Sequence, residues 1–148
     1  MKRLFILLLL ITAGHLSAQI TPDMLLGVWI PKKGDSRIKI EKIGSKYFGK
    51  VIWLKNPNEE GTNTPDTDDK NPDPALRAVP ILGLRIMKDF EYEGDGVFKS
   101  GNIYDPNKGK TYCGKITIVD NNTLDLRGSI CGFSLLGRTE TWTRYTGK

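Results

Sequence analysis

The sequence predicts an all-β protein that folds as a single antiparallel up-and-down β-barrel of about eight strands. Apolar and polar residues alternate with a period of two along most of the chain, and no long segment has the spacing of an amphipathic helix. Most of the predicted strands follow one another through connections too short to hold a crossover helix. Closure into a barrel removes the exposed edges that an open sheet must protect, so a β-sandwich ranks second.

The first 18 residues have the pattern of a secretory signal peptide. Lys2 and Arg3 precede an apolar stretch at residues 4–12, and residues 16–18 end in the small side chains of a cleavage site. The apolar stretch is too short to span a bilayer. We therefore predict export to the periplasm or the cell exterior, no transmembrane segment, and one barrel domain at residues 19–148. A buried amino-terminal helix is the disfavoured alternative.

Cleavage of the signal peptide would also remove the chain's one histidine, His15. Serine–histidine and cysteine–histidine catalysis are then excluded, together with the commonest metal ligand. Without Lys2 and Arg3, the 22 basic residues become 20 against 17 acidic ones, a net charge of +3. The basic residues alternate with apolar ones instead of clustering, so we expect no nucleic-acid partner.

Three segments near the start of the mature chain are expected to form an antiparallel meander. A short turn at residues 21–23 opens the first strand, residues 25–30. Residues 37–43 place isoleucines between charged neighbours, which is the alternation of a half-buried strand. Gly44 and Ser45 form a turn before the third strand, residues 46–54. These connections are short enough for hairpins only.

A long loop separates this meander from the rest of the predicted sheet. Residues 56–74 contain four prolines and many polar turn formers. Residues 94–96 and 105–109 have turn composition, and in the second a proline sets the first bend while a glycine accepts the positive φ that closes it. Five further strands, the first of them buried or irregular, are predicted at residues 80–88, 97–104, 110–119, 123–131 and 137–145.

The two cysteines, Cys113 and Cys131, are expected to form one disulfide in an exported chain. Two cysteines without histidine cannot make a structural zinc site. Keeping the apolar faces of both strands on one side centres the turn on Asn122 and places Ile118 opposite Leu126. In that register Cys113 lies directly opposite Cys131, on the polar face. A redox-active pair is disfavoured, since such pairs usually lie close in sequence near a helix terminus.

Three blocks in the second half of the chain resemble an exported bacterial family known only as domain of unknown function 2147. These blocks are GNIYDPNKGKTY at residues 101–112, LDLRG at 124–128 and GRTETWTR at 137–144. Shorter matches lie at Gly27-Val28-Trp29, Gly49-Lys50-Val51, Asn71-Pro72-Asp73 and residues 80–84. The resemblance covers nearly the whole predicted mature chain and implies a lipocalin-like barrel. It implies no activity, because none is assigned to the family.

Gly27 and Trp29 are similar to the opening motif of lipocalins, which implies a tryptophan that closes one barrel end against a late arginine. Arg144 matches the place of that arginine. We therefore predict a cation–π contact between Trp29 and Arg144 at one end of the barrel. Plain core packing of Trp29 is an equally favoured alternative.

The long loop is rich in carboxylates, which suggests an oxygen-ligand calcium site. Its aspartates are Asp66, Asp68, Asp69 and Asp73. Their spacing does not match the helix–loop–helix calcium template, because Lys70 stands at a ligand position and no glycine or closing glutamate follows. A solvated loop is the favoured interpretation, in which Arg77 would dock through a carboxylate pair.

Tyr104 and Asp105 lie close to Lys110 and Tyr112 in the sequence, and together they could form an acid–base cluster. A tight turn explains the same residues without catalysis and is favoured. No spacing in the chain singles out a catalytic pair, so no catalytic residue, cofactor or metal is predicted.

On the last predicted strand, Arg138, Glu140 and Arg144 alternate with threonines, which is typical of a solvated face. If Trp142 points inward, the two arginines join it inside the barrel. They would then orient an anionic head group while apolar side chains hold a tail. The candidate ligand-binding residues are Trp29, Tyr104, Arg138, Trp142 and Arg144.

The favoured function is a binding module of the cell envelope that holds a small, partly apolar or lipid-like molecule. A structural or protein-interaction barrel with a filled interior ranks second, its protein partner unidentified. A histidine-independent enzyme ranks third. Barrels of about eight strands can enclose one small ligand or be filled by side chains, so an open interior distinguishes the first reading from the second.

Overall fold

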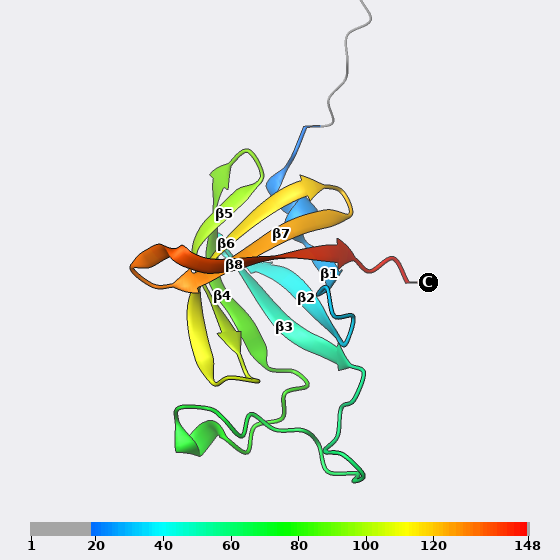
Figure 1. Ribbon diagram of the computed structural model, residues 1–148. Helices are drawn as coiled ribbons and strands as arrows, with labels where there is room; N and C mark the ends of the chain where they lie inside the picture. The colour runs from blue at the N-terminus through cyan, green and yellow to red at the C-terminus, as the bar shows by residue number, and fades with distance from the viewer. Residues whose placement is uncertain (1–18, 148) are drawn as a thin grey trace, which may run out of the picture.

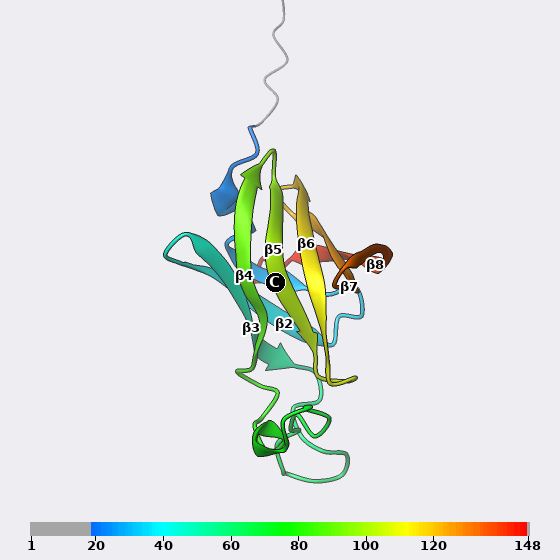
Figure 2. The ribbon, with the colours of Figure 1, turned by 90° about the vertical axis from the view of Figure 1, so that its left-hand side faces the viewer.

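The structure is a computed structural model that describes residues 19–147. Every strand pairs antiparallel with the next one along the chain, and β1 pairs with β8, which closes the barrel (Figures 1 and 2). The predicted up-and-down barrel is therefore confirmed. The strands are β1 (Gly27–Ile30), β2 (Ser36–Ile43), β3 (Lys46–Leu54), β4 (Arg85–Gly94), β5 (Val97–Asp105), β6 (Lys110–Asp120), β7 (Thr123–Ile130) and β8 (Phe133–Arg144).

One end of the barrel is closed by the short 3-10 helix η1 (Pro22–Leu25), blue at the top of Figure 1. Proline at the first helical position has the φ that the helix needs, so the turn predicted at residues 21–23 becomes the start of this helix. Leu25 is fully buried, and its carbonyl oxygen accepts a hydrogen bond of 2.9 Å from the indole N–H of Trp29. The helix is thereby fixed to the first strand.

Arg144 holds this closed end together. Its guanidinium carbon lies 4.3 Å from the centre of the Trp29 ring, so the predicted cation–π contact is confirmed. A Cβ at position 27 would lie 2.7 Å from the guanidinium, and Gly27 thus leaves the space that the arginine occupies. Burial lowers the pKa of Arg144. The guanidinium also donates to three backbone oxygens, those of Met24, Leu26 and Asn121.

Next to the closed end, large side chains fill one part of the interior. Tyr47 and Phe98 meet edge to face with ring centres 4.9 Å apart, and both are buried. The Phe90 ring lies over two strands, where a Cβ at Gly101 or Gly114 would approach it to 2.4 Å. These two glycines therefore make room for the phenylalanine, and an added methyl group would overpack the core.

The fourth strand starts later than the sequence predicts. The alternation indicates a strand at residues 80–88, whereas β4 is Arg85–Gly94 and residues 80–84 belong to the long loop. Asp89 has a φ of 61°, and this irregularity separates the buried residues Met87 and Phe90 by three positions instead of two. A period-two pattern cannot be followed through such a bulge, which explains why the predicted strand stops at residue 88 while β4 continues to Gly94.

The β6–β7 hairpin keeps its predicted faces, but its register differs from the prediction by two residues. Ile118 pairs with Leu124, so its expected pairing with Leu126 is wrong. Asp120 pairs with Thr123, which makes the turn tighter than one centred on Asn122. A shift of two residues returns every side chain to the same face, so matching the apolar faces cannot detect it.

The predicted disulfide is present, with the Cα atoms of Cys113 and Cys131 5.1 Å apart. The expectation that the two residues lie directly opposite each other is wrong, because Cys113 pairs with Ser129. Cys131 lies in the turn just after β7. The bridge therefore runs diagonally and fastens the β7–β8 turn to β6.

Three further predictions concern the signal peptide, the absence of a transmembrane segment and the start of the last strand. The signal peptide predicted at residues 1–18 lies outside the described residues. Within residues 19–147, no helix is long and apolar enough to cross a membrane. At the other end, β8 begins at Phe133, earlier than the predicted residue 137.

Candidate ligand-binding site

The barrel interior opens, on the side of the long loop, into a cavity of about 1100 Å³. This loop lies below the barrel in Figure 1, opposite η1. The volume is slightly above the usual range of small-molecule sites, about 300–1000 Å³. Strand residues and one loop residue supply an aliphatic wall, of which Ile130 and Leu136 are exposed: Ile38, Val51, Leu54, Ile81, Ile86, Ile103, Leu126, Ile130 and Leu136.

The inward face of β8 supplies the polar part of the cavity wall. Trp142, Glu140 and Arg138 alternate on this face and all line the cavity. Trp142 is buried, and its indole N–H donates to a Glu140 carboxylate oxygen at 3.0 Å. Arg138 is exposed toward the opening, and it is the one basic residue on a strand among the cavity-lining residues. A cation therefore lies beside an aromatic and aliphatic surface.

The rim of the cavity carries charges of both signs. Lys32 and Lys33 come from the β1–β2 connection. Lys108, in the β5–β6 turn, pairs with Asp105 at 3.3 Å. The rim also contains acidic and polar side chains, namely Asp35, Ser36, Asn56, Asp66 and Asn107.

A buried carboxylate fixes the long loop to the barrel. Asp68 is completely buried, and its carboxylate accepts hydrogen bonds of 2.6 Å from the Tyr104 hydroxyl and 2.6 Å from the Asn71 side-chain amide. Tyr104 lies on β5 and lines the cavity. The loop therefore has a defined position at the cavity mouth, set by an internal polar network.

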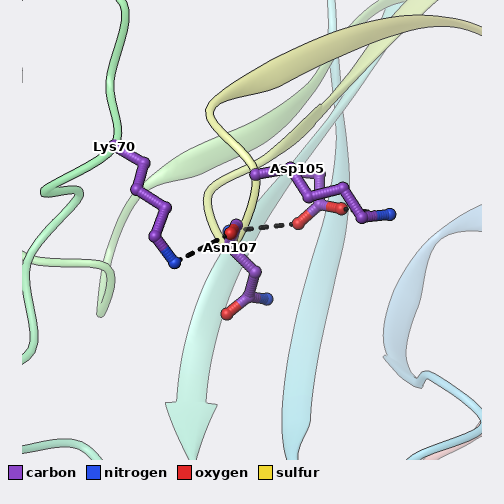
Figure 3. Close-up of polar contacts among 4 residues, drawn as sticks. Lys70, Asp105 and Asn107 are labelled. Atoms are coloured by element: carbon purple, nitrogen blue, oxygen red, sulfur yellow. Dashed lines mark hydrogen bonds and ion pairs between the residues drawn. The ribbon is translucent and has the colours of Figure 1, made fainter.

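A second contact joins the same loop to the β5–β6 turn (Figure 3). The Lys70 ammonium donates to the Asn107 carbonyl oxygen at 3.1 Å, and the Asn107 N–H donates to the Asp105 carboxylate at 3.1 Å. Gly109 follows in this turn, where a Cβ would lie 1.9 Å from the Lys70 carbonyl oxygen. Asp105 thus serves the turn, as the favoured interpretation of the sequence states.

Two aspartates of the long loop, Asp68 and Asp73, are engaged in hydrogen bonds within the loop. Within residues 19–147, no group of three acidic, histidine or cysteine side chains is placed to hold a metal ion. Asp73 instead caps the 3-10 helix η2 (Pro74–Leu76), accepting from the Ala75 N–H at 2.9 Å. Arg77 docks the loop through the Asn71 carbonyl oxygen, at 2.8 Å, and not through the predicted carboxylate.

The ionisation of Tyr104 should report this loop contact. Burial, together with the hydrogen bond to Asp68, raises the pKa of Tyr104 from 10.0 to about 12. The unfolded chain loses this proton near its ordinary pKa, so the contribution to stability is present below about pH 10 and is lost as the pH rises toward 12. We expect Tyr104→Phe to remove this part of the alkaline loss of stability, measured by urea unfolding across that range. Tyr145→Phe, which removes the hydroxyl from a ring stacked on Arg37, should leave this alkaline loss of stability in place.

Three of the five candidate residues lie in the cavity wall: Tyr104, Arg138 and Trp142. Trp29 and Arg144 lie at the closed end instead, away from the lining residues. The sequence offered no signal for Asp68, because its partner Tyr104 is 36 residues away and other aspartates, Asp66 and Asp69, lie beside it in the sequence.

Comparisons with known proteins agree with this architecture. The sequence model of a family described as "Uncharacterized protein conserved in bacteria (DUF2147)" matches residues 27–144. A solved structure of protein HP1028 from the human pathogen Helicobacter pylori, described as belonging to the lipocalin family, superposes with a TM-score of 0.71. The two chains share 24% identity over 83% of this chain and 84% of that one, which shows a common fold. No curated protein matches the sequence.

Proposed function

This chain belongs to the DUF2147 family of bacterial proteins, and from that premise we propose that its barrel binds a small amphiphile. The apolar tail occupies the cavity, and an anionic head group lies at the opening beside Arg138. The lipocalin-like fold is compatible with such a ligand, since barrels of this size can hold one small molecule.

The observation that carries the proposal is an open interior with a mainly aliphatic wall. The cavity of about 1100 Å³ does not fit a barrel filled by its own side chains. On the same face of β8, Trp142 offers a flat aromatic surface deeper in the cavity and Arg138 offers a positive charge nearer the opening. A carboxylate or phosphate head group can accept a bidentate hydrogen bond from such a guanidinium.

The proposed ligand is an amphiphile of the cell envelope, because the protein is expected to be exported there. The basic start and short apolar stretch of residues 1–18 support export to the periplasm or the cell exterior. Fatty acids and lipids of the envelope are amphiphiles of suitable chemistry there. Cleavage before Gln19 would be seen as an intact mass that lacks residues 1–18.

Native mass spectrometry of protein purified from its own envelope tests the proposal first. The protein is then titrated with a long-chain fatty acid and with the alcohol of equal chain length. A co-purifying lipid-like mass and tighter binding of the acid support it. Equal binding of acid and alcohol contradicts the role of Arg138. If no amphiphile binds, the hypothesis of a protein-interaction barrel replaces the hypothesis of a ligand-binding barrel.

Filling the cavity should abolish binding without disturbing the fold. Gly128 lines the cavity, and a Cβ there would lie 3.5 Å from Tyr112, which is an ordinary contact. We expect Gly128→Leu to weaken fatty-acid binding about tenfold or more, because the new side chain occupies space that the tail needs. Isothermal titration calorimetry measures the change. Lys115→Leu, on an exposed position of β6, is the matched control and should bind normally. Normal affinity in Gly128→Leu would place the ligand elsewhere.

A further inference from the structure

The β7–β8 turn and the strand residues beside it carry apolar side chains that are more than half exposed and lie outside the core. Leu135 is 92% exposed, Phe133 64%, Leu136 61% and Ile130 52%. We call these four residues the apolar tip. In Figures 1 and 2 the turn that bears it stands out from the side of the barrel. Scattered single apolar residues are normal on a surface, but four within seven positions form a patch.

Three features of the fold hold the tip in its exposed position. Between the pairs Ser129–Gly137 and Ile130–Phe133, the register shifts and residues 134–136 bulge out of the ladder. The Arg127 guanidinium donates to the Ser134 carbonyl oxygen at 2.9 Å and to that of Leu135 at 3.5 Å. The disulfide at Cys131 fastens the turn to β6. The bulge, the hydrogen bonds from Arg127 and the disulfide therefore all hold the apolar tip in its exposed position.

The charges around the tip are positive. Residues 126–139 contain Arg127 and Arg138 and no acidic residue. Lys115 pairs with Arg127 across the β6–β7 ladder and adds a third cation. Two carboxylates lie just outside this stretch: Asp125 accepts from the Thr141 hydroxyl at 2.7 Å and Glu140 from the Trp142 indole, and both keep their negative charge. Apolar side chains whose nearest charged neighbours along the chain are cations form the combination that binds the interface of an anionic membrane.

We propose that the apolar tip docks the barrel on an anionic lipid bilayer, with the cavity mouth beside the membrane surface. Ile130 and Leu136 belong to the tip and also line the cavity, so a path of apolar side chains leads from the tip into the interior. The choice of lipid as the occupant rests in part on the proposed function, because a bilayer is a source of amphiphiles. A second copy of the chain fits less well, since a stable protein interface engages about 20–30 residues on each side.

Cosedimentation with lipid vesicles tests this docking. The purified protein should bind vesicles of equal parts phosphatidylglycerol and phosphatidylcholine, and bind pure phosphatidylcholine about tenfold more weakly. Phe133→Ser combined with Leu135→Ser should lower the partition coefficient about tenfold or more, because two inserted side chains are lost. The matched control, Ile43→Ser combined with Val119→Ser, removes side chains of 49% and 50% exposure from other hairpins and should bind as the parent does.

Failure of the docking and failure of the proposed function give different results. The tip variant should keep its affinity for fatty acid in the absence of vesicles, whereas Gly128→Leu should lose that affinity and still bind vesicles. Docking is overturned if the parent does not bind mixed vesicles, or if the tip variant and its control bind them equally. It is also overturned if ultracentrifugation shows a dimer that the tip substitutions dissociate and vesicles do not compete with.

Discussion

Replacing Trp29 by alanine is expected to lower the free energy of unfolding by about 3–5 kcal/mol. The side chain is fully buried, its N–H donates to the Leu25 carbonyl oxygen, and its ring stacks on Arg144. Truncation therefore opens a large space at the closed end of the barrel and also removes the surface against which the guanidinium lies. Urea denaturation of parent and variant measures the loss as a lower midpoint at unchanged slope.

Trp53 provides the control for this experiment. It also stacks on an arginine, with the Arg37 guanidinium carbon 4.5 Å from the ring centre, but it is only half-buried. Trp53→Ala should lose the cation–π contact, about 0.5–1 kcal/mol at such a site, with little cavity formation. Equal midpoints for Trp29→Ala and the parent would show that the closed end does not depend on this plug.

The fold could be predicted because alternation is a local signal that most strands carry without interruption. The exceptions have a common cause, an irregular backbone. Asp89 displaces the pattern of β4, and the bulge at residues 134–136 hides the start of β8. The register of β6 and β7 failed for another reason: a shift of two residues preserves both faces, so only the turn geometry decides between the alternatives.

The sequence singled out Arg138 and Trp142 in the cavity wall, but it did not single out the aliphatic residues that line the rest of the cavity. Arg138 and Trp142 stand out in the sequence as unusual residues on an alternating strand. Ile103 and Leu126, which line the cavity, have the same alternation as Ile116, which is packed in the core. Whether an inward isoleucine meets another side chain or open space depends on residues across the barrel. Phe90 shows this, because it fills the space above Gly101 and Gly114, both on other strands.

Removing the disulfide with Cys113→Ala and Cys131→Ala is expected to lower the free energy of unfolding by about 3 kcal/mol. The bridge joins residues 18 positions apart, and closing a loop of that size restricts the unfolded chain by about this amount. Urea denaturation of the parent, of the double variant and of the parent kept reduced measures the loss, and the last two should agree. If all three midpoints coincide, or if protein from its native compartment has free thiols, the bridge does not stabilise the barrel.

The diagonal path of the bridge predicts where the folded protein should loosen. Cys131 lies in the β7–β8 turn, so losing its link to β6 leaves that turn held mainly by Arg127. In the double variant, backbone amides of residues 132–136 should therefore exchange hydrogen faster under native conditions, while those of β2 and β3 keep their relative protection. Because the same turn bears the apolar tip, vesicle binding should weaken along with this local protection. A uniform rise in exchange across the barrel would instead indicate that the bridge acts only on global stability.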